Sequence, residues 1–123
     1  MFKYLFIILP IVFISCQSSS SKQVIESSII SINGPEKAIV GDNVEIEITF
    51  NGGNGCSEPY DIKAEKVGQT IMLRAYYLQP TNQNCTYILP LYKLKYTFFA
   101  DLPGPYFFIS AQDNQVADTL VVY

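Results

Sequence analysis

Three cysteines and a few carboxylates are the residues from which this 123-residue chain could build a chemical site, because it contains no histidine. Histidine is the most common general base and zinc ligand, so its absence excludes a Ser-His or Cys-His nucleophile within this chain. Asp and Glu pairs remain available for acid–base work. We expect no catalytic residues, no metal and no cofactor, and hence a protein that is not an enzyme.

The start of the chain has the pattern of an export signal. Lys3 precedes an apolar run from Leu5 to Ile14, and the small residue Ser15 follows it. This order is typical of signal peptides, and the run is shorter than the about 20 residues of a membrane-spanning helix. We therefore assign residues 1–15 to targeting.

The Ser15-Cys16 pair resembles the lipobox of bacterial lipoproteins, in which a small residue precedes an invariant cysteine. The resemblance implies that Cys16 is lipidated and tethers the protein to a membrane. Residues 16–23 are serine-rich and predict a flexible tether. The expected location is a Gram-negative cell envelope, and the periplasmic face of the outer membrane is favoured because the tether has no acidic run. The alternative is an ordinary secretory peptide with a chance cysteine.

Cys56 and Cys85 are the two cysteines left for the folded part of the chain. An even pair in an exported protein predicts a disulfide, and closing a loop of about 30 residues would stabilise the fold by roughly 3–4 kcal/mol. Free thiols are one alternative. A metal site with Glu58 and Asp61 is another, but no histidine and no C-x-x-C spacing support it.

The charge balance limits the kinds of partner. The whole chain has 8 basic and 11 acidic residues. Removing residues 1–15 removes Lys3 and leaves a net charge of −4. Because nucleic acid binding needs a basic patch, we expect no nucleic acid partner.

Residues 24–123 alternate apolar and polar side chains with the period of β-strands. Val44, Ile46, Ile48 and Phe50 form one inward face, and Tyr92, Leu94, Tyr96 and Phe98 form another. Turn residues separate the runs. The predicted strands are 24–32, 43–50, 61–67, 70–78, 91–100, 105–111 and 116–123. Seven short strands predict one all-β domain built as a two-layer sandwich.

The stretch Asp101-Leu-Pro-Gly-Pro-Tyr106 resembles the Asp-x-x-Gly-x-Tyr tyrosine corner of immunoglobulin-like domains, and the turn at 40–42 is similar to the start of many bacterial modules of that family. The resemblance implies a seven-stranded immunoglobulin-like antiparallel β-sandwich. In it the Tyr106 hydroxyl would bond to the backbone upstream, and the second and fifth strands would be neighbours.

Neighbouring second and fifth strands would bring opposite charges together on an outer face. Glu45 and Glu47 would lie beside Lys93 and Lys95, and Arg74 would fall on the same face. Such pairs each contribute about 0.2–1 kcal/mol.

The last two predicted strands have apolar residues on both faces. With Tyr106, Phe108, Leu120 and Val122 inward, the candidate interface residues Phe107, Ile109, Val121 and Tyr123 point outward. An apolar patch of this kind often marks a docking surface. The alternatives are that the 79–90 loop covers it with Tyr87, Ile88 and Leu89, or that the register is shifted by one residue.

Three classes of function remain open. The favoured one is a non-enzymatic binding or scaffold module that is tethered to the membrane, binds an envelope protein or glycan, and can form a homodimer. Loop tyrosines suit recognition, and the candidates are Tyr60, Tyr76, Tyr77 and Tyr87. The second is a carboxylate-based envelope hydrolase using Glu58 and Asp61. The third is an immunoglobulin-like protease inhibitor with residues 52–55 as a protruding wedge.

Overall fold

The computed structural model describes residues 21–81 and 84–123. The predicted signal peptide, Cys16 and residues 17–20 of the predicted tether lie outside the described residues. Within them the chain is all-β, and no helix long and apolar enough to cross a membrane is found there. The strands are β1 (Lys22–Ser27), β2 (Ile29–Asn33), β3 (Lys37–Ala38), β4 (Asn43–Asn51), β5 (Glu58–Val67), β6 (Thr70–Pro80), β7 (Leu91–Phe99), β8 (Gly104–Ser110) and β9 (Ala117–Val122).

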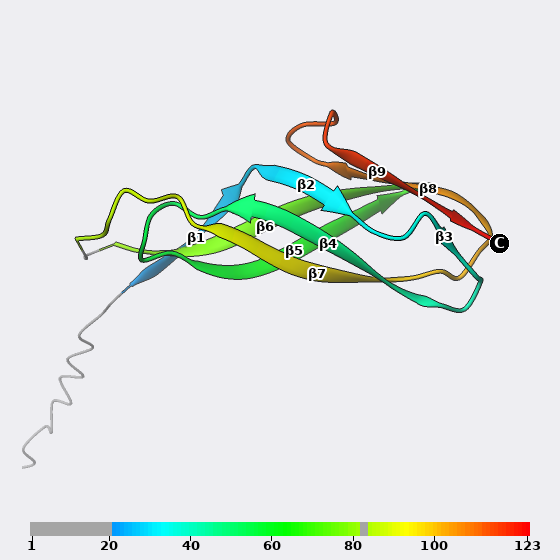
Figure 1. The fold of residues 1–123 in the computed structure, drawn as a ribbon, viewed down its shortest axis with the longest axis horizontal. Helices are drawn as coiled ribbons and strands as arrows, with labels where there is room; N and C mark the ends of the chain where they lie inside the picture. The colour runs from blue at the N-terminus through cyan, green and yellow to red at the C-terminus, as the bar shows by residue number, and fades with distance from the viewer. Residues whose placement is uncertain (1–20, 82–83) are drawn as a thin grey trace, which may run out of the picture.

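The strands form two sheets that pack against each other (Figure 1). The smaller sheet has the order β2-β4-β7. The larger has the order β1-β6-β8-β9-β3, and β5 also pairs with β6. β1 and β8 pair with different parts of β6, which are Ala75–Pro80 and Thr70–Leu73. The chain enters β1 at the same end as the loops that follow β4 and β6, and the C-terminus lies at the opposite end (Figure 1). We call these the tether end and the distal end.

The smaller sheet confirms the predicted neighbours. β4 and β7 pair antiparallel along their whole length, with Ile46 opposite Tyr96. Ile46, Ile48 and Phe50 are fully buried. On the outer face Lys95 lies 3.3 Å from Glu45 and Lys93 lies 3.8 Å from Glu47. Alternation along these strands thus predicted both faces correctly.

The predicted first strand, 24–32, is wrong as a single element. It divides at Ser28 into β1, which pairs with β6 in the larger sheet, and β2, which pairs with β4 in the smaller one. Because of this break, one continuous segment supplies an edge strand to each of the two sheets. The strand also starts at Lys22, two residues earlier than predicted, and β3 was not predicted at all. The described chain therefore has nine strands and not seven.

The expectation of a purely antiparallel sandwich is also wrong. β6 pairs with β8 in parallel over Thr70–Leu73, and β3 pairs with β9 in parallel. The first pairing arises because the chain crosses to the smaller sheet as β7 between β6 and β8. Arg74 consequently lies on the larger sheet and not beside Lys93 and Lys95, and its carboxylate partner is Glu26.

The core lies between the layers and is formed by the inward faces of both. Tyr106 and Phe108 of β8 are buried, as predicted, and both pack edge-on against Phe98 with ring centroids 4.9 and 5.3 Å apart. Leu120 and Val122 of β9 are also buried. The register expected for the last two strands is therefore confirmed.

The tyrosine corner is present as expected. The Tyr106 hydroxyl donates a hydrogen bond to the Leu102 carbonyl oxygen over 2.8 Å. Gly104 precedes it with φ of +132°, a conformation that L side chains rarely adopt. This explains why the motif carries glycine at that position.

The Cys56–Cys85 disulfide is present. It joins the loop after β4 to the loop after β6. Two backbone bonds join the same loops, from Gly55 N to Thr86 O (3.0 Å) and from Gly52 N to Pro90 O (2.9 Å). The two loops therefore form one braced unit.

Candidate binding face

The register of the larger sheet gathers the outward apolar residues of three strands. Phe107 lies between Thr70 and Thr119, and Ile109 lies between Met72 and Ala117. Further along, Val121 is opposite Pro105. The binding face, as we define it, consists of Met72, Phe107, Ile109, Val121 and Tyr123.

The outward orientation predicted for the interface residues agrees with the structure. Phe107 is 42% exposed and Tyr123 is 63% exposed, while Ile109 and Val121 are half-buried among their neighbours. The alternative in which the 79–90 loop covers this face is wrong. Tyr87 is fully exposed, and the loop lies at the tether end, where its backbone is bonded to the loop after β4.

A polar cluster borders the binding face where β1 meets β6. Glu26 accepts hydrogen bonds from Arg74 (2.8 Å) and Tyr76 (3.3 Å), and also from Gln112. The hydrogen bond from Gln112 is the largest cause of a lowered pKa of the Glu26 carboxyl, opposed by partial burial and reinforced by Arg74. Glu26 in turn raises the pKa of Arg74. The face thus combines an apolar centre with a rim of hydrogen-bonded polar groups.

We predict a pH-dependent contribution of Glu26 to stability. Because its pKa is lower in the folded state, the carboxylate favours folding above its ordinary pKa of 4.5, and this contribution is lost as the pH falls through the lowered value. Glu26→Gln should reduce the melting temperature by a few degrees at pH 7, since exposed pairs contribute little. The difference from wild type should shrink as the pH approaches 3.

Thermal unfolding followed by circular dichroism from pH 7 to pH 3 would measure this effect. Glu36→Gln is a matched control, because Glu36 is an exposed glutamate on another part of the surface. A difference between Glu26→Gln and wild type that stays constant over the whole pH range would contradict the prediction.

The four candidate recognition tyrosines are not brought together. Tyr76 and Tyr77, which were expected beside a loop, lie within β6, because this strand extends two residues beyond the predicted end at 78. Tyr76 is bonded to Glu26, and Tyr77 packs against the core. Tyr60 lies on β5, the edge strand, and is exposed. Tyr87 alone of the four lies in a loop and is fully exposed.

The structure also places the glycine loop differently from the predicted wedge. Gly52 is buried, and a Cβ on Gly53 would approach the Gln79 and Tyr77 side chains within 3 Å. The glycines allow the loop to pack closely against its neighbours, so residues 52–55 do not protrude. Residues 87–89 protrude instead, which the alternation of the flanking strands did not reveal.

The two carboxylates of the alternative hydrolase site each have a partner of their own. Glu58 is paired with Lys22 at 3.2 Å, and Asp61 accepts a hydrogen bond from the Ile62 backbone N–H. In the described part of the chain, no group of three or more Cys, Asp or Glu residues is placed to hold a metal ion. The cysteines of the alternative metal site are used in the disulfide.

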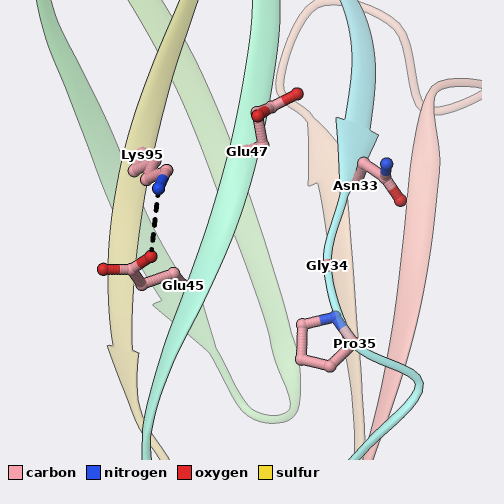
Figure 2. Close-up of a pocket in the computed structure, with 6 residues that line it drawn as sticks. All are labelled: Asn33, Gly34, Pro35, Glu45, Glu47 and Lys95. Atoms are coloured by element: carbon pink, nitrogen blue, oxygen red, sulfur yellow. Dashed lines mark ion pairs between the residues drawn. The ribbon is translucent and has the colours of Figure 1, made fainter.

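A hollow of about 330 Å³ lies on the outer face of the smaller sheet (Figure 2). Its charged groups are Glu45, Glu47 and Lys95, and Figure 2 shows Lys95 directed toward Glu45. Each glutamate already has a lysine partner, and the Glu45 and Lys95 side chains are both more than 60% exposed. The charged groups of the hollow are therefore paired with one another or with Lys93 and remain exposed to solvent.

Comparison with known proteins gives no identification, since no family model, curated protein or solved structure matches this chain.

Proposed function

We propose that this protein is a non-enzymatic binding module, tethered by a lipid on Cys16 to the outer membrane of a Gram-negative envelope and facing the periplasm. The support for the tether is the signal-like segment and the Ser15-Cys16 pair. The support for a binding role is the exposed binding face on the larger sheet. The partner is a protein, because the face is apolar and bordered by hydrogen-bonded polar groups.

The single observation that carries the proposal is the composition of this face. Phe107 and Met72 lie on the neighbouring strands β8 and β6, the exposed Tyr123 lies at the distal end of the face, and Arg74 lies at its rim. Aromatic residues, Met and Arg are the types enriched where proteins bind each other, and large exposed apolar patches are uncommon on monomers. Burial of the Phe107 side chain against a partner would contribute favourable free energy to binding, because apolar surface is removed from water.

We further propose that the fold is a variant of the immunoglobulin-like sandwich. The tyrosine corner at Tyr106 and the pairing of β4 with β7 support this relation. The variant differs in the division of its first strand and in the parallel pairing of β6 with β8. The first of these differences adds a strand, β1, to the larger sheet, where it pairs with β6.

Substitution of the two most exposed aromatic residues tests the proposed role. Phe107→Ser combined with Tyr123→Ser should abolish capture of the partner, or dimerisation, while the melting temperature changes by only a few degrees because both side chains are partly in solvent. Phe99→Ser is the matched control, since Phe99 is 55% exposed but belongs to the smaller sheet.

Crosslinking in the native envelope provides the measurement. A photoreactive amino acid at position 107 should crosslink to one defined protein or to a second copy, and the same group at position 99 should not. Equal crosslinking from both positions, or none from position 107, would overturn the proposal. Unfolding of the doubly substituted chain would show that these side chains belong to the core.

A further inference from the structure

The loop after β6 carries an exposed apolar tip of unusual composition. Tyr87 is fully exposed, Ile88 is 66% exposed and Leu89 is 61% exposed, and Leu91 follows them at the start of β7. The sequence contains no charged residue between Arg74 and Lys93. The loop after β4, which lies beside it, has none between Glu47 and Glu58. The two loops are therefore uncharged, and the loop after β6 presents apolar side chains to solvent, while the nearest ion pair at this end is Lys22–Glu58.

The backbone beneath this tip is anchored on both sides. The Thr86 carbonyl accepts a hydrogen bond from Gly55 N, and the Pro90 carbonyl accepts one from Gly52 N. Cys85 is held by the disulfide to Cys56. Residues 87–89 thus lie between two fixed carbonyls and present their side chains outward. Such preorganisation lowers the entropic cost of burying them in another phase.

The chain enters the domain beside the same loop. Thr81 N donates a hydrogen bond to the Ser21 carbonyl (3.1 Å), and the two hydroxyls are 2.6 Å apart. Lys22 is paired with Glu58, two residues after the disulfide cysteine Cys56. These contacts place the exit point of the tether and the loop tip at one end of the molecule (Figure 1).

The length of the tether limits how far this end can move from a membrane. Cys16 and Ser21 are separated by five residues, which span at most about 18 Å when fully extended. The 11 residues of β6 run from the distal end to the tether end, a length of about 36 Å. A lipid on Cys16 would therefore hold the loop tip near the bilayer, whereas the binding face extends along the domain toward the distal end.

We propose that Tyr87, Ile88 and Leu89 insert into the surface of the lipid bilayer and act as a second membrane contact. The inference rests on the proposed lipid tether at Cys16. The occupant is a bilayer because the tip lacks charge, is presented at the tether exit, and combines aliphatic residues with a tyrosine, a residue type enriched at membrane interfaces. A lipid on Cys16 holds the chain at one point only, so a second contact at the same end of the domain would fix its orientation relative to the bilayer.

The absence of tryptophan from the chain allows a direct test. The full-length lipidated protein carrying Tyr87→Trp is reconstituted in phosphatidylcholine vesicles, with and without brominated acyl chains. We expect a blue-shifted emission that the brominated lipid quenches, and little effect of salt because the tip is uncharged. Phe99→Trp at the distal end is the matched control and should show neither the shift nor the quenching.

Vesicle flotation separates this inference from the proposed tether. A chain that floats with the vesicles but shows no quenching in the Tyr87→Trp form would overturn the loop contact and leave the tether standing. A blue shift without quenching by brominated lipid would assign the tip to a contact with a second copy or another protein. A chain that does not float would overturn the tether, and the loop contact with it.

Additional substitutions confirm that the apolar side chains are responsible. Ile88→Ser with Leu89→Ser in the Tyr87→Trp background should reduce the quenched fraction by about tenfold. The reason is that the favourable free energy of transferring two aliphatic side chains from water to the bilayer is lost. Melting temperatures equal to that of wild type would show that the fold is intact, as expected for side chains that are largely in solvent. Unchanged quenching in these chains would contradict the insertion.

Discussion

Phe108→Ala should lower the free energy of unfolding by about 3–5 kcal/mol, the usual cost of removing a buried phenylalanine ring. Phe108 is fully buried between the sheets, and its ring contacts Phe98 edge-on at 5.3 Å. Its strand is paired on both sides, by β6 and β9, so the backbone has little freedom to close the cavity. A loss of this size is a large fraction of the stability of a domain of about 100 residues.

Urea unfolding of the wild-type and substituted chains would measure this loss. Phe107→Ala is the matched control, because the neighbouring ring points to solvent on the other side of the same strand. We expect the control to change stability by less than about 1 kcal/mol. Equal effects of the two substitutions would contradict the assignment of Phe108 to the core and of Phe107 to the surface.

Removal of the disulfide has the second largest expected effect. Cys56→Ser should lower the free energy of unfolding by about 2–4 kcal/mol, because the bond closes a loop with a sequence separation of 29 and restricts the unfolded chain. The backbone bonds Gly55–Thr86 and Gly52–Pro90 connect the same loops and should limit the change in the folded state. The strands of the core should therefore keep their structure in the substituted chain.

Thermal unfolding with and without a reducing agent would measure the contribution of the disulfide. Wild type under reducing conditions should match the Cys56→Ser chain, which serves as its control. Hydrogen exchange should increase in residues 84–90 and remain slow in β4 and β7. An unchanged melting temperature on reduction would show that the bond does not stabilise the protein.

The faces of the central strands were predictable because period-two alternation specifies which side of a strand is buried. Val44–Phe50, Tyr92–Phe98 and Tyr106–Phe108 point as the alternation indicates. The tyrosine corner was also predictable, since it depends on a local turn and a glycine at positive φ. The disulfide was predictable because no other cysteine was available within the folded part.

Strand pairing and loop exposure could not be derived in the same way. Nothing local in residues 24–32 shows that its two halves join different sheets, since that division depends on which partner edges are vacant. The apolar residues at 87–89 resembled a covering segment, but their backbone is anchored to the glycine loop and they point into solvent.

The sequence by itself determined that the domain is all-β, which side chains point inward along the central strands, and the cysteine pair, because these follow from local periodicity and composition. Only the tertiary structure decided that β8 lies parallel to β6, that Arg74 faces Glu26, and that the tether exit and the apolar loop share one end. These features depend on contacts between segments distant in sequence. Such contacts are selected by the packing of the whole chain and leave no pattern in any single segment.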